Sequence, residues 1–178
     1  MIGTVELLKL VNEIKLVENL CERESTNPEG TGFDLRLGEV YKFKGNTAYL
    51  GEKERFTPET ELVAKYGIQK SIMVMPGDYY LVKTMESVNL PKDISALIRP
   101  RRTLHNCGIL FAGSPVQAGY CGPLTFGIYN AGNVKVELEF GSRFSNITFF
   151  RNGENIRSYE GQWQGGRVST EGKIEKQI

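Results

Sequence analysis

From about residue 31 onward, the chain consists of short segments in which apolar and polar residues alternate, separated by Gly, Pro and Asn. The clearest segment is VKVELEF, in which Val134, Val136, Leu138 and Phe140 alternate with charged residues. Successive side chains of a β-strand point to opposite faces, so this pattern predicts a strand with one buried face. Such segments recur at intervals of roughly 8–12 residues, which is typical of a sandwich or barrel. The sequence therefore predicts a mainly β fold.

The N-terminal segment has a different period. Its apolar residues recur at helical spacing, at Leu7, Leu8, Val11 and Ile14. This spacing predicts one N-terminal helix, with Thr4 as its cap. Residues 21–32 are expected to form a loop by composition, and residues 59–67 to form a short helical turn.

The C-terminal tail is rich in Gly and polar residues and contains Trp163. We expect one domain over residues 1–178, in which 159–178 form a mobile arm. Two interpretations of Trp163 remain open. It is either an anchor on the body of the protein, or part of an arm that closes over a ligand or crosses to a neighbouring subunit.

Composition excludes several classes of function. With 22 basic and 21 acidic residues, the net charge of +1 gives no general attraction to nucleic acid or to an anionic membrane. No apolar run approaches the ~20 residues that span a bilayer. Three scattered cysteines predict a reducing compartment, hence the cytoplasm. The single histidine, His105, is interpreted as a turn residue, and the absence of a C-x-x-C pair argues against zinc.

The strongest local positive charge is the basic turn, residues 99–103, which includes Arg101, Arg102 and Thr103. Guanidinium groups bind phosphate through two parallel hydrogen bonds, and a hydroxyl adds a further donor. The alternative interpretation is a solvated surface turn.

A second candidate is the loop SPVQAGYCG (114–122), which contains Gln117 and Tyr120. The Tyr120 ring could lie against a sugar or base, and Gln117 offers both a donor and an acceptor. The alternative is a hairpin turn whose Tyr covers the edge of the core. In the strand that follows, Gly127 indicates either the close approach of a ligand or a bulge.

Taken together, these segments resemble the dCTP deaminase and dUTPase superfamily, most closely its short members from archaea, bacteria and phages. The resemblance rests on five segments in order: TGFDLRLG (31–38), MESVNLPKDISALIRPRRTLHNCGI (85–109), SPVQAGYCGPLTFGIYNAG (114–132), VELEFGSRFSNITFF (136–150) and YEGQWQGG (159–166). It implies a distorted jelly-roll β-barrel that forms a homotrimer, with active sites between subunits. It also implies a deoxynucleoside triphosphate ligand whose phosphates carry Mg²⁺, without zinc.

The resemblance also assigns roles to residues. Arg101, Arg102 and Thr103 would contact phosphate, and Tyr120 would pack against the deoxyribose. Gln164 and the glycines after it would close a lid, and the backbone of residues 109–120 would read the pyrimidine. Asn106 stands where the family carries a substrate-binding Arg.

Two positions depart from the family in ways that affect catalysis. Gln117 replaces the carboxylate that holds the attacking water in the phosphatases, and Gly127 replaces the Glu that shuttles protons in the deaminases. Arg102 replaces the first serine of the phosphate motif. Three hypotheses therefore remain: a hydrolase of dUTP or dCTP in which Gln117 positions water, a nucleotide sensor with little chemistry, and a structural trimer.

Overall fold

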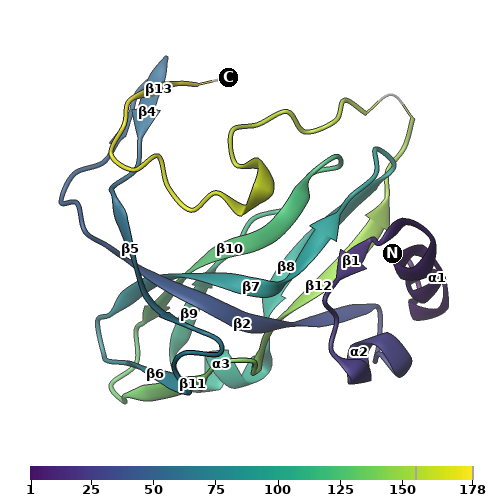
Figure 1. Cartoon of the computed structure of the whole chain (residues 1–178), viewed down its shortest axis with the longest axis horizontal. Helices are drawn as coiled ribbons and strands as arrows, with labels where there is room; N and C mark the ends of the chain where they lie inside the picture. Colours follow the sequence, from purple (N-terminus) through teal and green to yellow (C-terminus); the bar gives the residue numbers. More distant parts are fainter. Residues whose placement is uncertain (155, 178) are drawn as a thin grey trace.

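The computed structural model describes residues 1–154 and 156–177 (Figure 1). Its helices are α1 (Thr4–Ile14), α2 (Glu22–Thr26), α3 (Arg102–Asn106) and the 3₁₀ turn η1 (Gln164–Gly166). Its strands are β1 (Val17–Glu18), β2 (Gly32–Phe43), β3 (Tyr49–Leu50), β4 (Glu54–Phe56), β5 (Thr60–Lys65), β6 (Ser71–Val74), β7 (Tyr79–Asn89), β8 (Ile94–Pro100), β9 (Ile109–Ala112), β10 (Cys121–Asn130), β11 (Val136–Glu139), β12 (Arg143–Arg151) and β13 (Glu175–Lys176).

The main sheet is antiparallel and curls into a nearly closed barrel. Its strands follow the order β8-β12-β2-β7-β10-β9, and β1 and β5 pair with β7 and β2. An isolated bridge joins the two ends of this order, because Ala96 on β8 exchanges backbone hydrogen bonds of 2.9 and 2.8 Å with Val116, just after β9. The bridge holds the loop that leads into β10 against the body of the barrel.

The barrel interior is filled by the apolar faces of the alternating segments. Phe33 on β2 and Phe149 on β12 are fully buried and meet edge to face with ring centroids 6.1 Å apart. On β10, Leu124, Phe126 and Ile128 are buried, as the alternation predicts. The mainly β, distorted jelly-roll barrel with an N-terminal helix and a Gly-rich C-terminal arm is thereby confirmed.

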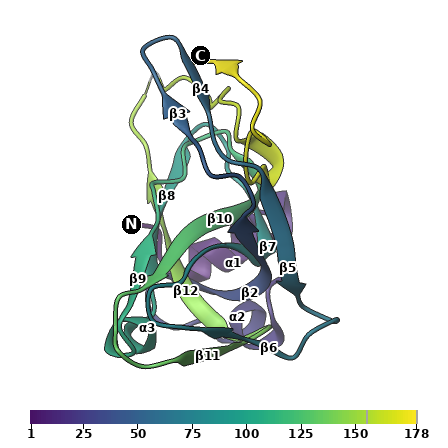
Figure 2. The same cartoon turned by 90° about the vertical axis from the view of Figure 1, so that its left-hand side faces the viewer.

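The C-terminal segment packs against the β3–β4 hairpin of its own chain. β13 pairs with β4, with Glu175 opposite Arg55, and lies beside the β3–β4 hairpin (Figure 2). Thr57 and Thr170 are joined by reciprocal backbone-to-hydroxyl hydrogen bonds of 2.9 and 2.8 Å. Ser169 and Thr170 are buried there. The arm is therefore docked, and the mobility expected of it stays a prediction.

Three local predictions were wrong. Residues 22–26 form α2, because the buried Glu24 carboxylate accepts the Asp34 amide at 3.0 Å and fixes this turn against β2. Residues 60–65 form β5, because pairing with β2 overrides the helical propensity of this segment. The residue that precedes α1 is Gly3, and Thr4 is already helical.

Membrane insertion through a helix finds no support in the described residues, where every helix is too short or too polar to cross a bilayer.

Candidate functional site

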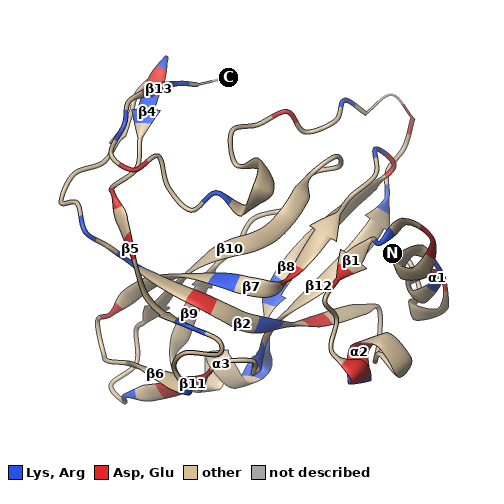
Figure 3. Cartoon of the chain, viewed as in Figure 1, with Lys and Arg blue, Asp and Glu red and all other residues tan. Residues whose placement is uncertain are grey.

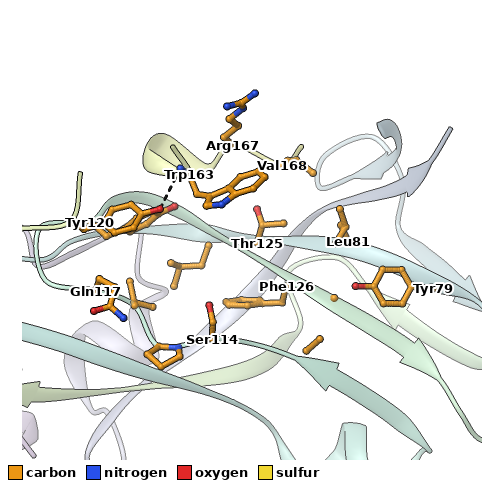
Figure 4. A pocket seen from close by; sticks show the side chains of 16 residues that line it. Tyr79, Leu81, Ser114, Gln117, Tyr120, Thr125, Phe126, Trp163, Arg167 and Val168 are labelled. Carbon is orange, nitrogen blue, oxygen red and sulfur yellow. Dashed lines mark hydrogen bonds between the residues drawn. The ribbon is translucent and has the colours of Figure 1, made fainter. Parts of the chain in front are cut away.

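A pocket of about 560 Å³ opens at the end of the barrel where the arm crosses β10 (Figure 4). Its walls come from β7, from the end of β9, from the loop between β9 and β10, from β10 itself and from the arm. The lining residues are Tyr79, Leu81, Ala112, Ser114, Pro115, Val116, Gln117, Tyr120, Leu124, Thr125, Phe126, Gly127, Tyr159, Trp163, Arg167 and Val168. The pocket therefore brings together three positions that the sequence singles out: Gln117, Tyr120 and Gly127.

The loop before β10 ends in a tight turn that places Tyr120. The Tyr120 amide donates to the Gln117 carbonyl at 3.1 Å, and Gly119 has the positive φ, +86°, that the third residue of a type II turn needs. Gln117 remains exposed at the pocket. This geometry leaves the Gln117 amide free to hold a water or a ligand.

Tyr120 is buried and fixed at its hydroxyl end. The hydroxyl donates to the Pro123 carbonyl at 2.7 Å and accepts from the Gly166 amide at 3.1 Å. Burial raises the pKa of Tyr120, and the Gly166 amide offsets part of this rise. The ring belongs to the core, as the hairpin interpretation expects, and it also lines the pocket. Its contact with a sugar or base stays a prediction.

Gln164 fastens the arm across the loop. Its Nε2 donates to the Gly119 carbonyl at 2.9 Å and to the Tyr159 carbonyl at 3.2 Å, while its Oε1 accepts from the Cys121 amide at 2.9 Å. Gly166 approaches β10 so closely that a Cβ there would lie 2.4 Å from the Pro123 ring. The segment that the resemblance assigns to a lid thus covers one side of the pocket.

Trp163 contacts two guanidinium groups at the pocket. Its ring is 4.9 Å from the Arg55 guanidinium and 5.7 Å from that of Arg167. Cation–π contacts of this kind contribute roughly 0.5–2 kcal/mol each. Trp163 is therefore anchored on its own chain and also lines the pocket. Arg167 is the only lining residue with a formal charge at neutral pH among the described residues.

The pocket is otherwise uncharged, and β10 carries no Lys, Arg, Asp or Glu (Figure 3). Thr125 Oγ1 is buried in the lining without a hydrogen-bond partner. Buried polar groups are nearly always paired, so this hydroxyl indicates a site that a ligand or a water completes. No group of three His, Cys, Asp or Glu side chains in the described part of the chain is arranged to hold a metal ion.

The basic turn lies elsewhere. α3 is at the opposite end of the barrel from η1 in both views (Figures 1 and 2), and the pocket lining contains no residue of 99–106. Arg102, Thr103, His105 and Asn106 are exposed on this one-turn helix. In a single chain, the candidate phosphate contacts and the pocket are therefore separate.

An ion-pair cluster made of Arg23, Glu24, Asp34, Arg101 and Arg143 supports the basic turn. Asp34 pairs with Arg101 at 3.1 Å and with Arg143 at 3.3 Å, and Arg143 also reaches Glu24 at 3.4 Å. The Glu24 side chain is 2% exposed. On the same strand as Asp34, the half-buried Arg36 pairs with the buried Glu86 carboxylate at 2.6 Å, and burial raises the pKa of Glu86 against the lowering effect of Arg36.

Among the polar residues of the pocket lining, sequence reasoning missed Tyr79 and Arg167. Arg167 follows two consecutive glycines, and a cation placed directly after a flexible turn could have marked it. Nothing local distinguishes Tyr79 from the next residue, Tyr80. Tyr79 reaches the pocket because β7 pairs with β10.

Comparisons with known proteins agree on one family. The model for dCTP deaminase-like proteins matches residues 2–152. The dCTP deaminase of Pyrococcus furiosus is 34% identical over 158 residues, which are 88% of this chain and 88% of that protein. A probable deoxyuridine 5'-triphosphate nucleotidohydrolase of Archaeoglobus fulgidus is 28% identical over 166 residues, 93% of this chain and 96% of that protein.

Among solved structures, the 2'-deoxycytidine 5'-triphosphate deaminase of Agrobacterium tumefaciens matches with a TM-score of 0.65 at 20% identity. The match covers 85% of this chain but only 47% of that one, so the chain spans about half the length of this structural neighbour. At this identity the likeness supports the fold.

Proposed function

The chain belongs to the dCTP deaminase-like family, and from this premise we propose that it binds a pyrimidine deoxynucleoside triphosphate, dUTP or dCTP, and hydrolyses it. The observation that carries the proposal is the pocket, in which Gln117, Tyr120 and the arm held by Gln164 meet. Its size suits a small-molecule ligand, because such pockets are typically about 300–1,000 Å³.

The ligand's phosphates require cations that the pocket largely lacks. We propose that three copies assemble so that Arg101, Arg102 and Thr103 of one chain face the pocket of another, with Asn106 beside them. Pairing with Asp34 holds Arg101 in place, which favours a preformed phosphate site. Mg²⁺ would arrive on the phosphates, because the described residues contain no cluster of acidic side chains that could hold it and Mg²⁺ commonly binds through substrate phosphates.

In the hydrolysis that we propose, Gln117 holds a water beside the phosphate chain. An amide orients a water but accepts its proton poorly, so positioning and charge neutralisation would supply most of the rate. Tyr120 would rest against the deoxyribose, since its ring is fixed at both the core and the arm.

A second candidate function is nucleotide binding without turnover, as in a sensor. The observation that favours it is the composition of the pocket lining, which contains no carboxylate and no imidazole among the described residues. A positioned general base typically contributes about 10²–10⁴-fold in rate, and this contribution would be missing.

Calorimetry with dUTP, dCTP and dTTP in the presence of Mg²⁺ tests binding, and measurement of pyrophosphate and ammonia tests turnover. We expect dUTP or dCTP to bind and pyrophosphate to be released slowly. No binding at millimolar nucleotide would leave only a structural role. Binding with no product would favour the sensor.

Two variants test the assigned residues. Gln117→Asp is expected to raise pyrophosphate release by about 10²-fold or more, since it supplies the missing base. Arg102→Ala should weaken nucleotide binding by roughly tenfold, and unchanged affinity would remove Arg102 from the phosphate site. Light scattering then reports whether the 20.0-kDa chain assembles as a trimer.

A further inference from the structure

The hydroxyl of Tyr79 lies where a side chain at position 127 would be. A Cβ added to Gly127 would lie 2.1 Å from Tyr79 Oη and 3.2 Å from the Ala112 methyl. Gly127 is buried on β10, between its strand partners Leu81 on β7 and Ala112 on β9. The space next to Gly127 is therefore already filled by a phenol that comes from the neighbouring strand.

Stacking holds the Tyr79 ring in place, and its hydroxyl faces the pocket, where it can contact a ligand. The Tyr79 ring stacks on Phe43, with centroids 5.5 Å apart and planes within 14°. Figure 4 shows its hydroxyl turned toward Phe126 and the interior of the pocket. Burial alone raises the pKa of Tyr79, whereas for Tyr80 and Tyr41 a hydrogen bond to a carboxylate also contributes.

The surroundings of Tyr79 fit a base better than a phosphate. Its neighbours in the lining are Leu81, Ala112, Phe126 and Gly127, none of which carries a charge. The one cation among the described lining residues, Arg167, comes from the arm. A flat, uncharged ring with polar edges suits such a surface, and a triphosphate does not. Thr125, whose hydroxyl has no partner, is two residues from Gly127 on the same strand.

Resting on the proposed function, we propose that the Tyr79 hydroxyl binds the pyrimidine by donating a hydrogen bond to one of its ring carbonyl oxygens. Tyr79 and Gly127 then depend on each other, because the phenol fits in this space only when position 127 has no side chain. A phenol that stays protonated at neutral pH donates a hydrogen bond but does not exchange protons as a carboxyl group does. The pocket would hold the base without changing it, so turnover would release pyrophosphate and no ammonia.

The test is calorimetry on the full-length chain with two probes, dUTP with Mg²⁺ and inorganic triphosphate with Mg²⁺. Tyr79→Phe keeps the ring and its stacking on Phe43 and removes only the hydroxyl. A hydrogen bond of this kind contributes about 1 kcal/mol net, so dUTP should bind about fivefold more weakly to the variant. The affinity for triphosphate should stay the same, since that probe has no base.

Tyr129→Phe is the matched control. Tyr129 lies opposite Tyr79 in the β7–β10 pairing and is equally exposed, at 40%, but it does not line the pocket. The affinity of the Tyr129→Phe variant for dUTP should stay within about twofold of wild type.

Each other outcome has a definite meaning. If Tyr79→Phe binds dUTP as tightly as wild type, the hydroxyl does not contact the base and the inference fails while the proposed function stands. If Tyr79→Phe loses affinity for both probes, or Tyr129→Phe loses as much for dUTP, the effect is structural and the inference also fails. If wild type binds neither probe, the proposed function fails, and this inference with it.

Discussion

At the α3 end of the barrel, carboxylates and guanidinium groups pair with one another, whereas the pocket at the η1 end contains a buried hydroxyl, that of Thr125, without a partner. Glu24 is buried and Asp34 and Arg143 are half-buried, and contacts of 3.3–3.4 Å join Arg143 to both carboxylates. Thr125 Oγ1, in the pocket lining, has no partner. Polar groups that satisfy each other hold a structure together, whereas unpaired ones are available to a ligand. The two regions should therefore respond differently to substitution: the first in stability, the second in binding.

The largest expected effect lies in the ion-pair cluster. Glu24→Ala leaves Arg143 without one of its two carboxylate partners and removes the acceptor of the Asp34 amide, so it should lower the free energy of unfolding by about 3–5 kcal/mol. Urea denaturation measures this loss. Glu59→Ala, which removes the partner of Lys44 at 3.0 Å in an exposed pair, is the control and should cost less than about 1 kcal/mol. Equal losses would show that burial does not distinguish the cluster.

A smaller effect tests the packing of Tyr79 against Gly127. Gly127→Glu forces a side chain into the space of the Tyr79 hydroxyl and should cost about 1–3 kcal/mol in unfolding free energy. The same substitution in a Tyr79→Ser background should cost at least about 1 kcal/mol less, because the phenol is gone. Urea denaturation of the four chains gives the coupling between the two positions. Additive losses would mean that the two positions do not share one space.

The hydrogen bonds by which Gln164 holds the arm should contribute less to stability than to limiting access to the pocket. Gln164→Ala removes three hydrogen bonds to backbone groups, from an exposed side chain, and should cost about 1–2 kcal/mol. Hydrogen exchange of residues 159–168 should quicken, while exchange in β2 and β7 stays unchanged. Uniformly faster exchange would show that the arm and the barrel open as one unit.

The smallest effect is a pH dependence. Burial raises the pKa of Glu86, so the folded chain takes up a proton on this group more readily than the unfolded chain. The stability that this proton contributes is complete below the ordinary glutamate pKa of about 4.5 and is lost as pH rises through the folded pKa. The unfolding free energy of wild type relative to Glu86→Gln should therefore fall as pH rises above 4.5. A constant difference between pH 4 and pH 8 would contradict the raised pKa.

Sequence patterns predicted elements in which local alternation and burial agree. In β11 and the residue after it, Val136, Leu138 and Phe140 are buried as expected, whereas Val134, before the strand begins, is 53% exposed. β5 was missed because its Glu, Ala and Lys residues favour a helix locally and only pairing with β2 makes them a strand. The spacing of apolar residues within one short segment does not show which distant strand that segment pairs with.

The same limit applies to the site. Gln117, Tyr120 and Gln164 could be singled out because turn chemistry and family resemblance are properties of short segments. Their roles toward a ligand stay predictions. Tyr79 was missed because its contact with Gly127 depends on the register between two strands about fifty residues apart. The roles of Arg101, Arg102, Thr103 and Asn106 stay predictions, since no residue of this turn reaches the pocket of its own chain.

Trp163 is the only tryptophan of the chain, and it lies in the pocket lining with two guanidinium groups 4.9 and 5.7 Å from its ring. Its fluorescence emission therefore comes from one known place, and both neighbouring guanidinium groups and any molecule in the pocket alter the polarity around the indole. The protein thus carries a built-in optical probe. Occupancy of the pocket and departure of the arm can be followed in stopped-flow experiments without attaching a dye.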